Sequence, residues 1–143
     1  MQRDLLLLGE MTGAAERASE LVTGITVQAL QADRLHGESL LWNFTVLGEA
    51  ATQLSDDITE RFPAIPWQQP ARLRNRIVHG YWSIDLDILH TTATDQLPTF
   101  ARDFRQILDT LTAGEHTATA LTPDAAAPAP EQPQDPARSD GEG

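Results

Sequence analysis

The stretch LWNFTVLGEAATQL, residues 41–54, decides the fold class of this chain. Its apolar residues recur at steps of three and four: Leu41, Phe44, Leu47, Ala51 and Leu54. That spacing places them on one face of a helix, whereas a strand would alternate apolar and polar residues. The stretch therefore predicts a helix over about residues 38–55 whose apolar face is buried against other helices.

The sequence before this stretch repeats the pattern. A second apolar stripe has the same spacing: Leu8, Met11, Ala15, Ala18 and Val22. It predicts a helix that ends at Thr23-Gly24, because a glycine commonly follows the last helical residue. The segment from Thr26 to Arg34 predicts a second, shorter helix.

The sequence after residue 55 is also helical in character. Pro66 suits the first turn of a helix that stops at Gly80, although Pro70 favours a slightly later start. Asp85 is the predicted N-cap of a last helix, in which Pro98 marks a kink or a restart. The apolar stripe of that helix consists of Leu97, Phe100, Phe104, Ile107 and Leu111. Since no strand-like alternation and no internal repeat is present, the chain is predicted to be an all-α bundle of four or five helices.

Composition divides the 143 residues into a body, residues 1–112, and a tail, residues 113–143. The tail holds five of the nine prolines and almost no large apolar residue. Such a segment buries too little surface to offset its ordering entropy, so it is expected to be disordered. It carries six acids and one base, a net −5 of the chain's −11, which leaves −6 on the body.

Several classes of protein are excluded or disfavoured by composition. The chain has no cysteine, which rules out disulfides, thiolate chemistry and cysteine-based zinc sites. The leucine run near the N-terminus is too short for an export signal, and no stretch approaches the roughly 18 apolar residues of a membrane span. We therefore expect a soluble cytoplasmic protein with no membrane association.

One segment stands out chemically: RLRNRIVHGYW, residues 72–82. It places three arginines within five residues of an acidic protein, followed by a histidine and the chain's only tyrosine. One interpretation is a cationic helix C-terminus that complements the helix dipole. The other is an anion site, because arginine offers fixed planar donors to a phosphate.

An arginine and a histidine are sufficient for metal-free RNA cleavage by the 2′-hydroxyl. The arginine would hold the phosphate and its developing charge, and the histidine would act as general base or acid. On an ideal helix Arg74 and His79 lie roughly 140° apart, so they share a face only if the helix unwinds near Gly80 or the arginine reaches round. By spacing alone, Arg76 is the better partner of His79.

The other three histidines, His36, His90 and His116, each stand alone in the sequence. None has a second ligand at metal-binding spacing, so we expect surface or structural roles for them, no metal site and no cofactor.

The segment RNRIVHGYW, residues 74–82, resembles the R-x4-H-x-Y signature of HepT-like toxins, a branch of the HEPN superfamily. The resemblance covers about residues 3–109 and is strongest over residues 43–98. It includes the G-E-A run at residues 48–50, PAIPW at residues 63–67 and D-L-D-I at residues 85–88.

The resemblance implies a HEPN-type bundle that forms a homodimer, with the motifs of two protomers near a shared cleft. It assigns the catalytic arginine to Arg74 and the catalytic histidine to His79, and Asn75 matches the polar residue that commonly follows the arginine. Tyr81 matches the tyrosine on which a partner antitoxin, a minimal nucleotidyltransferase, places AMP and silences the toxin. The family assignment overrides the spacing preference for Arg76.

The arginines flanking Arg74 are candidates for a supporting role. Arg72 and Arg76 could hold RNA phosphates or pair with Glu49. A carboxylate beside the apolar stripe would be partly buried and would need a cationic partner, for which Arg74 or Arg76 is the natural choice. A solvated glutamate on the polar face is the alternative.

Two functions follow from these observations. The first is the toxin of a type VII-like HEPN/nucleotidyltransferase toxin–antitoxin system, a metal-independent endoribonuclease acting on RNA. The second is a non-catalytic HEPN module that binds a nucleotide or a partner protein. The intact Arg74/His79 pair favours the first, and the acidic body favours the second, because RNA binding draws much of its affinity from neutralised phosphates.

Overall fold

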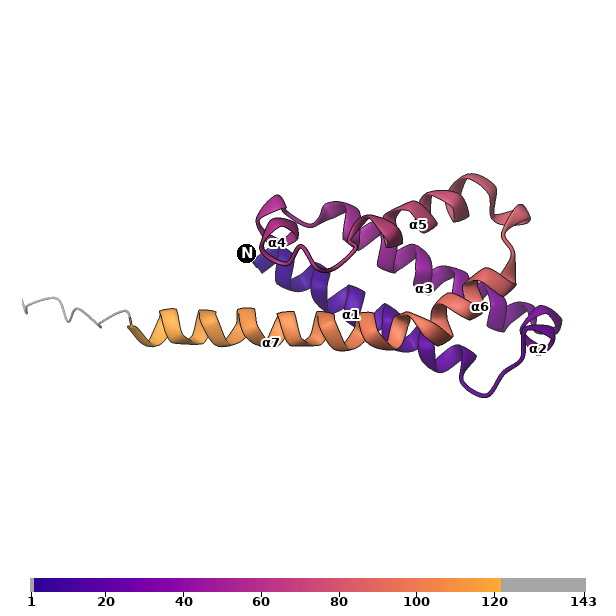
Figure 1. Ribbon diagram of the computed structural model, residues 1–143, viewed down its shortest axis with the longest axis horizontal. Coiled ribbons are helices and arrows are strands. Elements are labelled where there is room, and N and C mark those ends of the chain that lie inside the picture. Colours follow the sequence, from indigo (N-terminus) through magenta and orange to yellow (C-terminus); the bar gives the residue numbers. More distant parts are fainter. Residues whose placement is uncertain (1, 122–143) are drawn as a thin grey trace, which may run out of the picture.

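The computed structural model describes the backbone of residues 2–121 and the side chains of residues 2–114. Figure 1 shows that helices are the regular secondary structure throughout this part of the chain. The elements in chain order are α1 (Gln2–Val22), α2 (Val27–Ala32), α3 (Arg34–Gln53), α4 (Asp56–Arg61), α5 (Gln68–Gly80), the 3-10 turn η1 (Tyr81–Ser83), α6 (Leu86–Asp95) and α7 (Leu97–Leu121). The all-α prediction is confirmed.

Local sequence explains where several helices begin and end. After α1 the chain reverses through Gly24, whose φ of 71° lies in the left-handed region that favours glycine. The Thr26 hydroxyl then caps α2 by accepting from the Ala29 amide, and Asp33 caps α3 by accepting from the His36 amide. Asp85 caps α6, as the sequence predicts.

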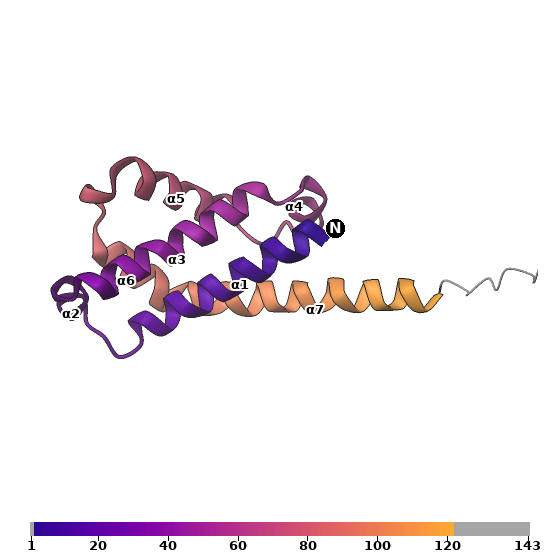
Figure 2. The same ribbon diagram turned by 180° about the vertical axis from the view of Figure 1, so that it is seen from behind.

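The helices pack in a fixed order. α1 lies between α3 and α7, and α5 lies on the other side of α3, as Figures 1 and 2 both show. The largest fully buried side chains come from every α-helix of the described part except α5: Phe44, Phe104, Leu8, Met11, Leu30, Leu40, Leu47, Ile58, Leu89 and Leu97. α5 packs against α3 and makes few direct contacts with α6 and α7.

A buried carboxylate joins the start of α1 to the start of α4. Asp4 is 7% exposed, its Oδ1 accepts from the Ser55 amide at 3.0 Å, and its Oδ2 accepts from the Ser55 hydroxyl at 2.7 Å. Burial alone would raise the pKa of Asp4, but these two hydrogen bonds outweigh it and lower the pKa below 3.8.

The structure differs from the sequence prediction at several points: the described residues form seven α-helices rather than four or five, and α3 begins at Arg34 rather than near residue 38. α4 was not expected, because its six residues contain a single buried apolar side chain, Ile58, and therefore show no stripe. α7 continues through residues 113–121, which the sequence analysis assigned to the tail. The first proline of that tail is Pro123, so nothing before it interrupts a helix. The rest of the predicted tail lies outside the described residues.

Two prolines sit where the sequence places them. Pro98 lies in the first turn of α7, so the stretch after Asp85 forms two helices and the restart interpretation is correct. Pro70 lies in the first turn of α5, which begins at Gln68 rather than at Pro66. Within residues 2–121, no helix combines the length and the apolar character needed to cross a bilayer.

Candidate functional site

The site is built where α3 crosses α5, and Gly48 sets the distance between the two helices. A Cβ at Gly48 would lie 2.2 Å from the Arg74 Cβ and 2.4 Å from the Pro70 carbonyl oxygen. No residue other than glycine fits against these atoms without moving a helix. The G-E-A run therefore lets α5 approach closely and brings the next residue, Glu49, beside Arg74.

Arg74 is held by two neighbours. Its Nη2 lies 2.9 Å from Glu49 Oε2, and its Nη1 donates to Asn75 Oδ1 at 2.9 Å. Its Nε is buried and has no hydrogen-bond partner in the described part of the chain. The Arg74 side chain is 28% exposed and that of Glu49 is 47% exposed, so the guanidinium is fixed but still reaches solvent.

The ion pair belongs to a polar chain that crosses three helices. Gln53 Nε2 donates to Glu49 Oε1 at 3.0 Å, and Arg3 Nη2 donates to Gln53 Oε1 at 2.8 Å. The chain thus runs from α1 through α3 to Arg74 on α5. Hydrogen bonds of this kind hold a long side chain in one orientation, which is what a phosphate-binding arginine needs.

The prediction that Glu49 takes an arginine partner is confirmed, and the partner is Arg74. The suggestion that Arg72 or Arg76 pairs with Glu49 is wrong, because neither forms an ion pair with it within the described residues. Arg72 Nη2 donates instead to Gln68 Oε1 at 3.1 Å on its own helix. Arg76 is exposed and makes no hydrogen bond, ion pair or ring contact within the described residues.

His79 and Tyr81 lie at the other end of α5. α5 leaves helical geometry only at Gly80, whose φ and ψ are −168° and 47°, and this break comes after both motif residues, so it does not bring His79 round to Arg74. His79 is exposed in the last helical turn, roughly 140° around the axis from Arg74. The structure therefore places the two motif residues on one helix but on different faces of it.

The Tyr81 phenol is accessible. Tyr81 is 63% exposed and meets Trp82, itself 77% exposed, edge to face at 5.4 Å between ring centroids. The two rings contact each other but remain outside the core. Tyr81 also lies near the first turn of α3, where Arg34 donates to Glu38 at 2.8 Å. The bond to Glu38 raises the pKa of Arg34, and Tyr81 adds a smaller electrostatic contribution. No pattern in the sequence indicates that Arg34 lies near Tyr81.

The isolated histidines have structural roles. A ring nitrogen of His36 meets the Leu21 carbonyl, and one of His90 meets the Ile25 carbonyl at 2.6 Å. His36 thus ties the last turn of α1 to α3, and His90 ties the loop after α1 to α6. The side chain of His116 lies outside the described residues. Among the described side chains, no group of three or more His, Asp or Glu residues could hold a metal ion.

An all-α bundle with an R-x4-H motif on a helix packed across α3 is a HEPN-type fold. A family model described as "Ribonuclease HepT-like" matches residues 11–107. The chain therefore belongs to the HepT-like ribonuclease family.

Individual relatives agree with this assignment at low identity. A probable ribonuclease HepT from Thermococcus cleftensis is 24% identical over 100 residues, which cover 70% of this chain and 91% of the relative. A putative RNase from Methanocaldococcus jannaschii is 24% identical over 89 residues, 62% of this chain and 74% of the relative. A second putative RNase from that organism is 32% identical over 66 residues, 46% of this chain and 57% of the relative. No solved structure matches the chain.

Proposed function

We propose that this protein is the toxin of a HEPN/nucleotidyltransferase toxin–antitoxin system and acts as a metal-independent endoribonuclease. The observation that carries the proposal is the fixed guanidinium of Arg74, held by Glu49 and Asn75 on the helix that also presents His79 to solvent. Membership of a ribonuclease family supports RNA as the substrate.

The chemistry needs only these side chains and the RNA itself. A general base takes the proton of the 2′-hydroxyl, and the 2′-oxygen attacks the adjacent phosphorus. The bond to the 5′-oxygen breaks, and that oxygen takes a proton from a general acid. The products are a 2′,3′-cyclic phosphate and a 5′-hydroxyl. His79 supplies proton transfer, and Arg74 holds the phosphate oxygens as charge develops on them.

Two copies of the chain make a better site than one. Arg74 and His79 lie on different faces of α5. A second protomer can therefore supply the His79 that acts with the Arg74 of the first. The exposed stripe of α3 suits such a partner: Leu35, Trp42 and Glu49 recur every seven residues, with Leu35 78% and Trp42 66% exposed. A symmetric dimer on this stripe, the commonest closed assembly, would bring two Arg74–Glu49 pairs into one groove.

Dimerisation would also offset the negative charge of the body, which disfavours RNA binding. The body carries a net −6, which repels RNA at long range. Two α5 helices meeting at one groove would gather six arginines from residues 72–76 of both protomers. This gives a local cationic surface on an acidic protein.

Control by a partner nucleotidyltransferase would act at Tyr81. Its exposed phenol is accessible to a modifying enzyme, and it lies two residues after His79. Transfer of AMP from ATP to the phenol oxygen would release pyrophosphate and leave a bulky anion at the end of α5. That group would compete with RNA for the arginines and obstruct access to His79.

The second candidate function is a non-catalytic module that binds a nucleotide or a partner protein. The observation that favours it is the pairing of Arg74 with Glu49, which already neutralises the guanidinium. The two functions differ in whether the purified protein cleaves RNA.

The experiment measures cleavage of a single-stranded RNA by purified parent, His79→Ala and Arg74→Ala proteins. Loss of the histidine should lower the rate about 10²- to 10⁴-fold, the usual worth of positioned acid–base catalysis. Arg102→Ala is the matched control, because Arg102 is exposed on α7 and bonds only Thr99. Cleavage should persist in EDTA. Equal rates for His79→Ala and the parent, or loss of cleavage in EDTA, would contradict the proposal.

A further inference from the structure

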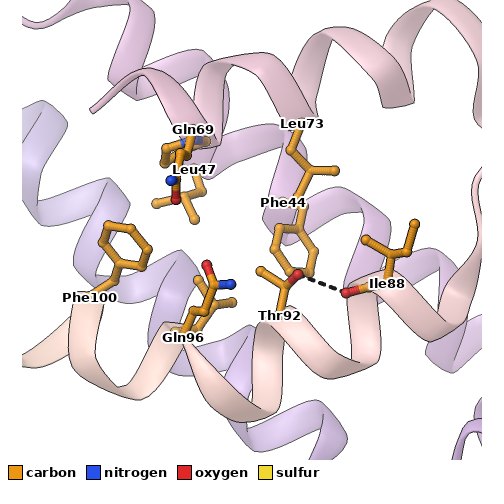
Figure 3. Close-up of a pocket in the computed structure, with 10 residues that line it drawn as sticks. Phe44, Leu47, Gln69, Leu73, Ile88, Thr92, Gln96 and Phe100 are labelled. Carbon is orange, nitrogen blue, oxygen red and sulfur yellow. Dashed lines mark hydrogen bonds between the residues drawn. The ribbon is translucent and has the colours of Figure 1, made fainter. Parts of the chain in front are cut away.

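A cavity of about 170 Å³ opens between α5 and the helices α6 and α7. It exists because α5 packs on α3 and barely touches those two helices. Figure 3 shows the apolar side chains that line it, among them Leu47 and Leu73. Two phenyl rings, those of Phe44 and Phe100, complete this apolar lining. Leu73 directly precedes Arg74, so the cavity and the proposed ribonuclease site share helix α5.

Two carboxamides face each other across this cavity. Gln69 comes from α5 and Gln96 follows α6, and Figure 3 shows both amide ends pointing into the space from opposite sides. Neither side chain makes a hydrogen bond within the described residues. Thr92 is different, since its hydroxyl already donates to the Ile88 carbonyl at 2.7 Å. The cavity therefore combines apolar walls with two free amides, each able to donate and accept.

The charges around the cavity are unequal at its two ends. Asp95 and Asp103 line the adjoining hollow together with Gln69 and Gln96. At the other end, Arg76 follows Gln69 by seven residues, which places it on the same face of α5 and about 10 Å along the axis. It is the only arginine among residues 2–114 without a partner. An anionic group would thus be repelled from the first end and attracted to the second.

We propose that this cavity binds one unpaired nucleobase of the RNA, with the attached phosphate directed towards Arg76. This inference rests on the proposed function and names the part of the substrate that sets its sequence preference. Single-stranded RNA is read by stacking splayed bases on aromatic rings and by hydrogen bonds to their edges. Phe44 and Phe100 offer the apolar contact, and the amides of Gln69 and Gln96 offer the edge contacts.

The size of the cavity fits a base rather than a larger group. An apolar cavity of about 150 Å³ holds a benzene ring. A space of about 170 Å³ therefore accommodates one heteroaromatic ring with its exocyclic atoms. Both glutamines are exposed, so their amides can exchange hydrogen bonds with water for hydrogen bonds to the edge of a base, whereas a neutral aliphatic ligand offers none.

The first arm of the test measures base binding without any cleavage. The side-chain amide signals of Gln69 and Gln96 are followed by NMR while uridine, cytidine, adenosine and guanosine are titrated separately into the parent protein. At least one nucleoside should shift both signals. Thr92→Phe, which fills the cavity, and Gln96→Leu, which removes one amide while keeping similar size, should weaken binding roughly tenfold or more. Gln106→Leu is the matched control, since Gln106 lines a different hollow on α7.

The second arm maps the cleavage positions of the same proteins on an RNA pool. The base preference next to the cut should weaken in Gln96→Leu and remain in Gln106→Leu. If no nucleoside moves the amide signals of the folded parent, the inference is overturned. It is also overturned if Gln96→Leu keeps the parent's cleavage pattern. If nucleosides bind but RNA stays intact, the base site stands and the ribonuclease proposal fails.

Discussion

Replacing Gly48 with alanine adds one methyl group at the place where α3 and α5 are closest. The new Cβ would lie 2.2 Å from the Arg74 Cβ and 2.4 Å from the Pro70 carbonyl oxygen. Carbon atoms in favourable contact are about 3.5–4.0 Å apart, so α5 must move away by more than about 1 Å. Neither obstacle is the end of a flexible side chain, so the backbone itself has to shift.

The magnitude follows from two opposing effects. Overpacking at a tight contact costs about 1–3 kcal/mol, and this contact belongs near the upper end because backbone atoms are involved. An alanine in a helix interior gains about 1 kcal/mol over glycine. The net loss is about 2 kcal/mol of unfolding free energy, which corresponds to a Tm lower by about 5–10 °C for a chain of this size.

The assay is thermal unfolding followed by far-UV circular dichroism, with Gly9→Ala as the matched control. Gly9 lies within α1, and a Cβ there meets nothing within 4 Å. The same substitution should therefore raise the Tm by a few degrees, which is the opposite sign. A Gly48→Ala protein as stable as the parent, or stabilised like Gly9→Ala, would refute the view that this glycine fixes the helix crossing.

Three further predictions concern stability, assembly and control. Asp4→Asn should lower the Tm at neutral pH and flatten its dependence on acid below about pH 4, where the carboxylate of the parent begins to take up its proton. Because the pKa of Asp4 is lowered in the folded state, its carboxylate stabilises the fold above about pH 4, and this stabilisation is lost as the pH falls through the folded-state pKa. A Tm that depends on pH in the same way in Asp4→Asn and in the parent would contradict this. Trp42→Asp should sediment as a monomer while the parent sediments as a dimer at micromolar concentration, and a monomeric parent would end the dimer proposal. Tyr81→Phe should gain no AMP mass when incubated with a partner nucleotidyltransferase and ATP, and a gain equal to that of the parent would place the acceptor elsewhere.

The helical fold could be predicted because each long helix carries its own stripe of apolar residues. The stripe from Leu8 to Val22 and the one from Leu41 to Leu54 coincide with α1 and α3. Caps and breaks were equally local, as Asp85 and Gly24 illustrate. α4 escaped prediction because a single buried residue, Ile58, makes no periodic pattern.

The site was predictable only where the chemistry is local. The need of Glu49 for a cationic partner follows from its place beside an apolar stripe, but the choice of Arg74 over Arg76 depends on how α5 crosses α3. That crossing depends on the missing Cβ of Gly48, which no spacing rule reveals. The cavity between Gln69 and Gln96 could not be predicted for a related reason. Its walls come from α3, α5, α6 and α7, and apolar spacing does not determine how these helices are oriented relative to one another.

The attachment of α5 to α3 alone has a consequence for how the protein loses activity. Regions with few tertiary contacts open locally at a smaller free-energy cost than global unfolding. The residues proposed for phosphate binding, proton transfer and modification all lie on α5 or directly after it, while the largest buried side chains lie elsewhere. We therefore expect inactivation on heating to precede melting of the bundle, and amide hydrogens of α5 to exchange before those of α1 and α3. A dimer partner or a bound RNA that covers α5 should raise the free energy of local opening of α5 towards that of global unfolding.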